Sequence, residues 1–300
     1  MLKFFQRLFR KEKPIAPPAI SVETAPLSEE QIKTVTVATT NIKPPQLIVG
    51  CAQSVGLQRD HNEDTLFFLT ALLSDNNTEL PFGIFIIADG MGGHQHGEVA
   101  SGIATRSMAE YLLKHLYPPL MGVRNETATE SLQEIIENGV VEAHQLVLRR
   151  APGGGTTLTT ALVIGEQVIL AHVGDSRAYF IYPDGRVQVI TQDHSLVRRL
   201  VQLGQLTDEE AAVHPQRNVL YRAIGQNEPF RPDINSHLVP HPGYMLLCSD
   251  GLWGVVPDDE IFRIVSSAPN LTQACQELIK AANAAGGPDN ISVILTQYVC

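Results

Sequence analysis

Four short acidic segments, separated by long stretches of other sequence, carry residues of the types that bind metal ions. Three of the pieces place an aspartate at the exit of an apolar run, beside glycine. Carboxylate and carbonyl oxygens are hard ligands, which suit Mg²⁺ or Mn²⁺ better than metals that prefer sulfur. The segments are 59–64, 88–93, 248–254 and 286–290, with 172–177 as a fifth piece. Together they predict a site that holds hard cations over a phosphate group.

The aspartates of these segments occupy positions from which they can meet at one end of a β-sheet. Asp89 and Asp250 each end a hydrophobic strand and precede a glycine, and Asp289 stands just before the last predicted strand. In a β-sandwich these strands can be neighbours, so carboxylates far apart in sequence can converge. Two cations about 3.5–4 Å apart can share a carboxylate and a water, lower the pKa of that water and orient an incoming phosphate.

Arg59 supplies the positive group that a phosphate site needs. Its planar guanidinium can donate to two phosphate oxygens and position the ester against the metals. Four residues later, Glu63 could face the metals, while Asp64 could hold their waters. A surface salt bridge between Arg59 and Asp60 or Asp64 is the alternative, and the sequence leaves both open.

The composition excludes some classes of protein and is otherwise ordinary for a globular chain. With 300 residues, of which 44% are hydrophobic and 18% charged, the chain can bury a substantial core. The net charge of −10 argues against broad nucleic-acid binding, which needs a basic surface. The four cysteines are widely spaced, which favours reduced thiols in a cytoplasmic protein. No apolar run reaches about 18 residues, so no membrane-spanning helix is expected.

The first 46 residues are expected to precede the folded domain, which is predicted to span 47–300. Residues 1–13 place apolar and basic side chains at helical spacing and carry a charge of +4, from five basic residues and Glu12. This segment could touch an anionic membrane surface weakly, dock on a partner as a short helix, or remain a frayed basic tail. Residues 14–46 contain six prolines among Thr, Val and Ser, which predicts a disordered linker.

From residue 47 the sequence predicts many strands and a few long helices. A capping-box spacing from Thr127 to Glu130 indicates the start of the second helix, and a Pro-Asp-Gly sequence at 183–185 indicates a hairpin turn. Strands and helices that do not alternate favour an α+β sandwich over a doubly wound sheet. The expected strands are 47–54, 83–88, 157–164, 168–173, 178–182, 187–190, 244–248 and 291–298, and the expected helices are 97–116, a second from 127, and 271–284.

The segments resemble the metal-dependent serine/threonine protein phosphatases of the PP2C type, also called the PPM family, in their bacterial single-domain form. The resemblance spans about residues 49–299 and keeps the order and spacing of the family's motifs. It implies an α+β fold of four layers, αββα, in which helices flank a central antiparallel β-sandwich with the metals at one end. The matching residues are Arg59-x-x-Asn-Glu-Asp64, Asp89-Gly-Met-Gly-Gly93, Gly155-Thr-Thr157, Val173-Gly-Asp-Ser-Arg177, Ser249-Asp-Gly-Leu-Trp253 and Asp289-Asn290.

The resemblance implies a role for each metal ligand. Asp89 would bridge two core ions of Mn²⁺ or Mg²⁺, and Asp250 and Asp289 would complete the site of one ion. Glu63 and the backbone carbonyl of Gly90 would complete the site of the other.

Further residues surround these ligands. Asp64 would lie just outside them, and Arg59 would bind the substrate phosphate, which makes Arg59, Asp89 and Asp250 the implied catalytic set. Asp175 would join Asp250 at a third, weaker metal; a plain turn at a strand end is the alternative for Asp175. Trp253 is expected to pack in the core.

The chain departs from the animal members of the family at one position. Those members carry a histidine after Asp-Gly, proposed as the acid that protonates the leaving group, where this chain has Met91. The proton donor therefore stays open between metal-bound water, His61 and His94, and the two histidines are near the motifs in sequence only.

Residues 191–225 are polar and resemble the family's flap subdomain, which lies beside the site. A brief helix could begin at Thr207. The arginines of this segment could contact a phosphorylated chain, although a solvated helix face explains the first two equally well. They are Arg198, Arg199, Arg217 and Arg222.

The implied function is hydrolysis of phosphoserine and phosphothreonine esters in proteins by attack of a metal-bridging water. The expected partners are phosphorylated proteins, with a serine/threonine kinase or its targets as antagonist, and the expected state is a monomer in the cytoplasm. Two alternatives stay open: a phosphatase of the same mechanism that acts on another phosphoester, and a non-catalytic phosphoprotein-binding module. The second alternative predicts missing metal ligands, and Glu63, Asp89, Asp250 and Asp289 are all present.

Overall fold

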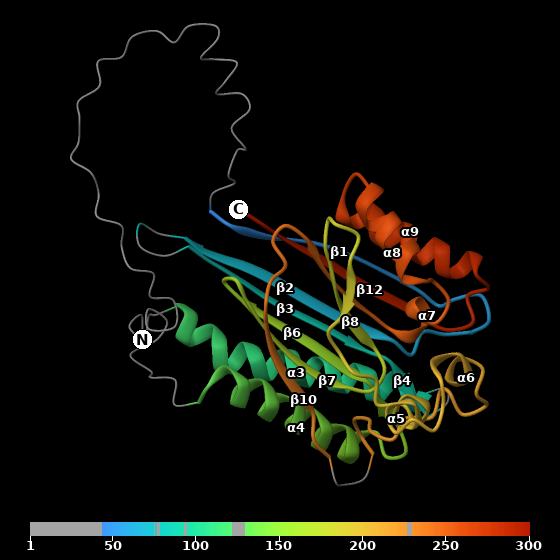
Figure 1. Ribbon diagram of the computed structural model, residues 1–300. Helices are drawn as coiled ribbons and strands as arrows, with labels where there is room; N and C mark the ends of the chain where they lie inside the picture. The colour runs from blue at the N-terminus through green and yellow to red at the C-terminus, as the bar shows by residue number, and fades with distance from the viewer. Residues whose placement is uncertain (1–43, 75, 77–78, 93–94, 122–129, 227–229) are drawn as a thin grey trace, which may run out of the picture.

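Two five-stranded antiparallel sheets form the centre of the protein (Figure 1). The computed structural model describes residues 44–74, 76, 79–92, 95–121, 130–226 and 230–300. The first sheet has the order β1 (Gln46–Ser54), β12 (Ile291–Val299), β11 (Tyr244–Cys248), β8 (Arg177–Ile181) and β9 (Val187–Val189). The second has the order β10 (Asp233–Leu238), β7 (Gln167–Val173), β6 (Leu158–Ile164), β3 (Glu79–Ala88) and β2 (Thr65–Ser74). A small third sheet pairs β4 (Gly90–Met91) with β5 (Gly155–Thr156).

Helices cover the outer faces of both large sheets (Figure 1), which confirms the predicted four-layer αββα sandwich. The long helices α3 and α4 pack on the second sheet, and α8 and α9 pack on the first. Three short helices, α5, α6 and α7, belong to the loops at the strand ends. The helices span α3 (Gln95–Met121), α4 (Leu132–Arg150), α5 (Leu196–Gln202), α6 (Asp208–Ala212), α7 (Asp250–Trp253), α8 (Asp258–Ser267) and α9 (Leu271–Ala284).

Three hydrophobic clusters fill the spaces between the four layers, and β3 contributes to two of them. Successive side chains of a strand point to opposite faces, so Ile84 and Ile86 pack towards α3 and α4, whereas Phe85 and Ile87 pack between the sheets. All four side chains have no exposed surface. The continuous apolar run of β3 is therefore explained by burial on both faces.

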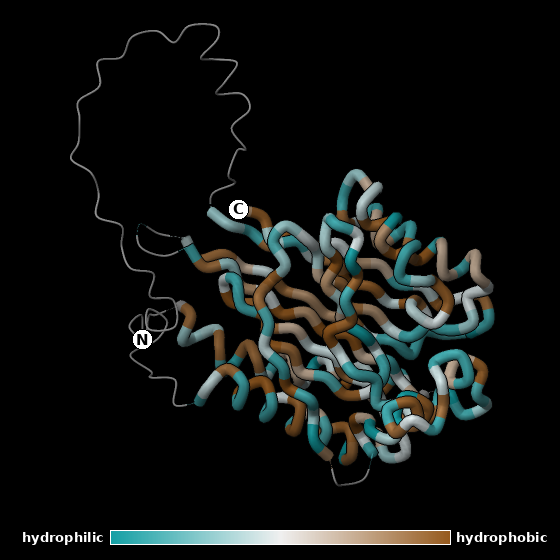
Figure 2. The backbone as a smooth tube through the Cα atoms, viewed as in Figure 1, coloured by the Kyte–Doolittle hydropathy of each residue, from teal (hydrophilic) through white to brown (hydrophobic). Residues whose placement is uncertain are grey.

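The outer helices present one apolar face to the sheets. Figure 2 shows hydrophobic residues along the central strands and mixed hydrophobic and hydrophilic residues along the outer helices. The helix predicted at 271–284 is α9, with the same bounds. Its buried residues are Leu271, Ala274, Cys275, Leu278, Ile279 and Ala282.

The structure corrects the predicted start of the second long helix. The predicted capping box begins at Thr127, which lies outside the described residues. The helix α4 begins instead at Leu132, and its capping box is formed by Ser131 and Glu134, whose side chains each accept from the other's backbone N–H at 3.2 and 2.7 Å. Both candidate pairs have a hydroxyl followed three positions later by Glu, and the pair beside the amphipathic stretch forms the cap.

Several observed elements are absent from the predicted set, among them β2, β10 and α8. Strand β10 has a largely polar sequence, because it lies at an edge of its sheet. The predicted N-terminal segment and linker lie outside the described residues up to residue 43, and β1 begins at Gln46, one residue before the predicted domain boundary. In the described part of the chain, no helix is both long enough and apolar enough to cross a membrane.

Phe85 of β3 and Phe68 of β2 lie directly opposite each other and provide a matched test of the layered core. Phe85 has no exposed surface, whereas Phe68 is 39% exposed. We expect Phe85→Ala to lower the free energy of unfolding by about 3–5 kcal/mol, because it leaves a cavity between the sheets. Phe68→Ala should cost roughly half as much or less. Urea denaturation measures both free energies of unfolding. Equal losses of stability in the two variants would contradict the burial of Phe85 between the two sheets.

Candidate active site

The first sheet delivers three aspartates to one end of the sandwich. The end of β11 is paired with the starts of β12 and β8. Asp250 lies two residues after β11, Asp289 two residues before β12, and Asp175 two residues before β8. The glycine after Asp250 is required by close packing, because a Cβ at Gly251 would collide with the carbonyl oxygen of Asn290.

The second sheet delivers the other acidic residues to the same end. The end of β3 is paired with the start of β2, so Asp89, just after β3, lies near Asp64, just before β2. The backbone N–H of Gly90 donates to the carbonyl of Glu63 at 3.2 Å, which ties the two chain segments together.

Hydrogen bonds join the acidic ends of the two sheets. The hydroxyl of Ser249 donates to Oδ2 of Asp64 at 2.7 Å. The side chain of Asn290 accepts from the backbone N–H of Glu63 at 2.8 Å and donates to the carbonyl of His61 at 2.9 Å. Asn290 had no assigned role in the sequence, although it stands within the Asp289-Asn290 motif that pointed to the site. The structure identifies it as the residue that holds the loop before β2 against β12.

The carboxylates raise one another's pKa because they share a poorly hydrated space. Burial, together with the charges of Asp64 and Asp250, raises the pKa of Asp89 well above its ordinary value. Burial and the charges of Asp175 and Asp289 act in the same direction on the pKa of Asp250. Burial raises the pKa of Asp64 to about 6 and that of Asp175 to about 7. A cation placed among these groups would favour their ionised form.

Two carboxylate oxygens of this cluster are buried and have no hydrogen-bond partner among the described residues. They are Oδ1 of Asp64 and Oδ1 of Asp250. Within the described ranges, no three His, Cys, Asp or Glu side chains form a ready-made metal shell. Buried carboxylate oxygens are hard donors, so the chemistry of this cluster fits a divalent cation such as Mg²⁺ or Mn²⁺.

Arg59 is ion-paired, but not with either of the partners considered from the sequence. Its Nη2 lies 2.7 Å from Oδ2 of Asp289, 230 positions away in the chain. Its side chain remains 49% exposed, so the guanidinium is accessible from solvent. Glu63 is also engaged, since its Oε1 lies 3.0 Å from Nε2 of His61.

Of the two histidines considered as proton donors, the structure describes only His61. His61 lies within the site, in contact with Glu63. His94 lies outside the described residues. Met91, which stands where animal members of the family have histidine, is a partly exposed residue of β4.

The flap at 191–225 contacts the acidic end of the sandwich, but most of its arginines are already paired. The backbone N–H of His194 donates to the carbonyl of Gly174, next to Asp175, at 2.7 Å. Arg222 pairs with Asp233 at 2.7 Å. The predicted brief helix after Thr207 is α6, and Thr207 caps it. Arg198 pairs with Asp208, Arg199 donates to Gln202, and Arg217 is exposed.

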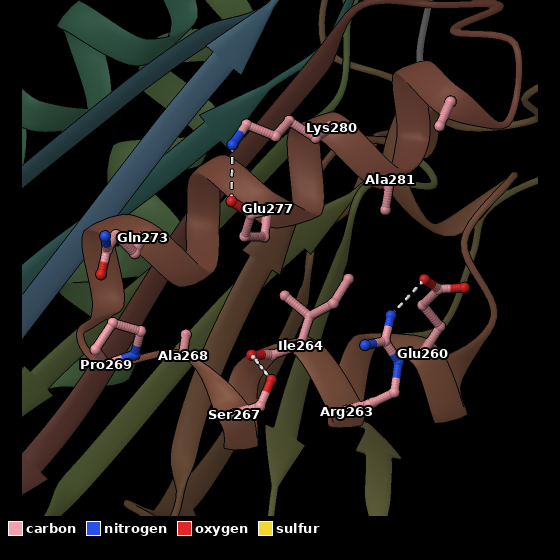
Figure 3. A pocket seen from close by; sticks show the side chains of 11 residues that line it. Glu260, Arg263, Ile264, Ser267, Ala268, Pro269, Gln273, Glu277, Lys280 and Ala281 are labelled. Carbon is pink, nitrogen blue, oxygen red and sulfur yellow. Dashed lines mark hydrogen bonds and ion pairs between the residues drawn. The ribbon is translucent and has the colours of Figure 1, made fainter.

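Two hollows on the surface are not part of this cluster. One, of about 500 Å³, lies between α8 and α9 (Figure 3) and contains the ion pairs Arg263–Glu260 and Lys280–Glu277. The other, of about 930 Å³, lies between β2 and α3. Neither is lined by a carboxylate of the acidic cluster. The candidate active site is the acidic cluster itself, at the end of the sandwich where these carboxylates meet.

Comparison with known proteins places the chain in a family. The model of the family described as protein phosphatase 2C matches residues 50–291. The serine/threonine phosphatase stp of Listeria innocua is 37% identical over 245 residues, which cover 81% of this chain and 92% of that protein. The chain therefore belongs to the protein phosphatase 2C family.

Solved structures of phosphatases share the fold. Stp1, a serine/threonine phosphatase from Staphylococcus aureus, superimposes with a TM-score of 0.69 at 32% identity, covering 84% of this chain and 94% of Stp1. The catalytic domain of the serine threonine protein phosphatase PstP, solved with two manganese ions, gives a TM-score of 0.66 at 30% identity, covering 85% of this chain and 99% of that domain. The predicted enzyme class, a protein phosphatase acting on phosphorylated proteins, is confirmed.

Asp250 should destabilise the metal-free protein. Because the pKa of Asp250 is raised on folding, the folded chain binds more protons than the unfolded chain above the ordinary pKa of 3.8. The free energy of unfolding therefore falls as the pH rises through this range. In EDTA at about pH 7.5, Asp250→Asn should unfold at a higher urea concentration than the native chain, and the gain should shrink towards about pH 4.

Asp184→Asn provides the control for this measurement. Asp184 is exposed in the β8–β9 hairpin, where a hydrogen bond from Arg186 lowers its pKa. This variant should be no more stable than the native chain at either pH. Equal gains in the two variants would show that the acidic cluster is not the source of the effect.

Proposed function

We propose that the chain hydrolyses phosphoserine and phosphothreonine esters in proteins, with Mn²⁺ or Mg²⁺ as cofactor. The observation that carries the proposal is the cluster of acidic side chains with raised pKa values and unpartnered oxygens at one end of the sandwich. The two manganese ions in the PstP structure support the choice of metal. When bound, such ions lower the pKa of water and neutralise the charge of a phosphate.

Asp89 is the residue that we assign to both core ions. It follows β3 of the second sheet, and the charges of Asp64 from the same sheet and Asp250 from the first sheet both raise its pKa. A carboxylate has two oxygens, so Asp89 could bind one ion through each. The remaining core ligands are Asp250 and Asp289 from the first sheet, and Glu63 and the carbonyl of Gly90 from the second.

Asp64 and Asp175 complete the proposed site. Asp64 is held by the hydroxyl of Ser249 and lies just outside the ligands. Asp175 is 7% exposed, and its charge raises the pKa of Asp250. We therefore assign Asp175, together with Asp250, to a third and weaker metal ion.

Arg59 is the proposed phosphate-binding residue. Its guanidinium is half-exposed at the rim of the acidic cluster, where a phosphate can reach it. The planar guanidinium of Arg59 can donate hydrogen bonds to two phosphate oxygens and so orient the ester towards the acidic cluster.

The flap favours a protein substrate over a small phosphoester. Several large apolar side chains are exposed on this segment, where a bound peptide could contact them. A peptide chain can cover such side chains, and a small phosphate cannot. The residues are Leu203, Val213, Val219 and Tyr221, which are 55%, 79%, 45% and 43% exposed.

The partners and the location belong to the same proposal. The antagonist is a serine/threonine kinase, whose products or own phosphorylated residues would be the substrates. The four cysteines are free thiols, which supports a reducing, cytoplasmic location. The chain acts as a monomer, and residues 1–13, which lie outside the described part, supply at most a weak contact with anionic membrane surfaces.

Removal of one proposed ligand should abolish metal-dependent activity. We expect Asp250→Asn to lower phosphate release from a phosphothreonine peptide by on the order of a hundredfold or more, in Mn²⁺ and in Mg²⁺. The native chain should lose its activity in EDTA, and Asp184→Asn should behave as the native chain. Retained turnover in Asp250→Asn would refute the metal assignment. Comparison of the peptide with p-nitrophenyl phosphate separates protein substrates from small phosphoesters.

Arg59 should contribute to substrate binding more than to metal binding. Since a hydrogen bond between charged groups contributes about 1.5–3 kcal/mol, Arg59→Ala should raise the KM for the phosphopeptide by roughly tenfold or more. Arg263→Ala, which removes an exposed arginine of the α8–α9 hollow, is the matched control. An unchanged KM in Arg59→Ala would exclude its phosphate role.

A further inference from the structure

Arg177, the first residue of β8, is a largely buried cation close to the acidic cluster, and the proposed site gives it no role. Its guanidinium grips the carboxylate of Asp193, with Nε 3.0 Å from Oδ1 and Nη2 2.6 Å from Oδ2. Asp193 is itself 6% exposed. Because Asp193 lies at the start of the flap, this pair fastens the flap to the first sheet.

The same guanidinium lies over the ring of Trp253, with Cζ 3.6 Å from the ring centroid. The indole N–H of Trp253 donates to the backbone carbonyl of Asp175 at 3.0 Å. The prediction that Trp253 packs in the core is therefore only partly correct. The ring packs at the margin of a hydrophobic cluster and remains partly exposed, while its polar edge holds the loop that carries Asp175.

These contacts form an unbroken path from the flap to the acidic cluster. Asp193 orients Arg177, Arg177 stacks on Trp253, and Trp253 holds the backbone of Asp175. Trp253 also ends the single turn of α7 that begins at Asp250. The path therefore connects the two residues assigned to the third metal ion.

We propose that Arg177 and Trp253 are positioning residues that fix Asp175 relative to Asp250 and thereby set the affinity of the weaker, third metal ion. The inference rests on the proposed function, because it requires Asp175 to be a ligand. Partners that orient metal ligands commonly change metal affinity by about 10- to 100-fold when they are removed.

The loop that carries Asp175 is held on two sides. Removal of one contact should therefore shift Asp175 without unfolding the loop. On the flap side, the N–H of Gly174 donates to Nδ1 of His194 at 3.1 Å. Gly174 has a φ of +109°, and a Cβ there would meet the side chain of Thr157, so the loop turns where only glycine fits. Loss of the Trp253 contact would release only the other side of the loop.

The chain contains a matched cation–aromatic pair for comparison. Arg186 lies over the ring of Tyr182 at 4.3 Å, and its Nε lies 2.8 Å from Oδ2 of Asp184. Its side chain is 67% exposed in the β8–β9 hairpin. Arg186→Lys therefore repeats the chemical change of Arg177→Lys away from the acidic cluster.

The test is calorimetric titration of Mn²⁺ into the full chain after treatment with EDTA, with circular dichroism to establish folding. Trp253→Phe keeps the ring beneath the guanidinium and removes the N–H donor. We expect the weakest Mn²⁺ site of Trp253→Phe to bind roughly tenfold or more weakly, and the tighter sites to be unchanged. Arg177→Lys should change in the same direction, and Arg186→Lys should match the native chain.

Native-like Mn²⁺ binding in folded Trp253→Phe would overturn the inference. If Arg177→Lys fails to fold, Trp253→Phe alone decides. Asp175→Ala serves as the reference: if its Mn²⁺ binding equals that of the native chain, Asp175 is no ligand and the inference falls, while the two-ion proposal stands. If the native chain binds neither Mn²⁺ nor Mg²⁺, the proposed function fails as well.

Discussion

The repulsion among acidic side chains at one end of the sandwich is the constraint that the rest of the structure has to satisfy. Burial and mutual repulsion raise the pKa of Asp89 and of Asp250 well above the ordinary value. Neutral donors compensate this only in part, through Ser249 and Asn290. The acidic residues remain together because each is attached to a strand whose position the two sheets fix.

The four-layer packing makes this attachment rigid. Each acidic segment lies at most two residues from the end of a strand, so little chain length is left for the charges to move apart. The strands are in turn held by clusters above, between and below the sheets. The free energy of core packing thus holds a site that is unfavourable on its own, as is common where function requires strain.

Features that depend on local sequence could be predicted, and features that depend on distant partners could not. The helix α9 was predicted at its observed bounds because its apolar spacing is regular. Asp89 and Asp250 could be singled out as candidate ligands because glycine follows each at a strand end, and both lie in the acidic cluster. By contrast, no sequence pattern links Arg59 to Asp289, since that pair exists only after both loops meet at one end of the sandwich. The stack of Arg177 on Trp253 was missed for the same reason.

The ion pair between Arg59 and Asp289 links the proposed phosphate-binding residue directly to a proposed metal ligand. Under the proposed assignments, a cation held by Asp289 would compete with Arg59 for this carboxylate and leave more of the guanidinium's N–H donors to a phosphate. Such competition would favour an order in which the cation binds before the phosphorylated protein. The same contact would weaken, without abolishing, phosphate binding by the metal-free molecule, because Arg59 stays 49% exposed.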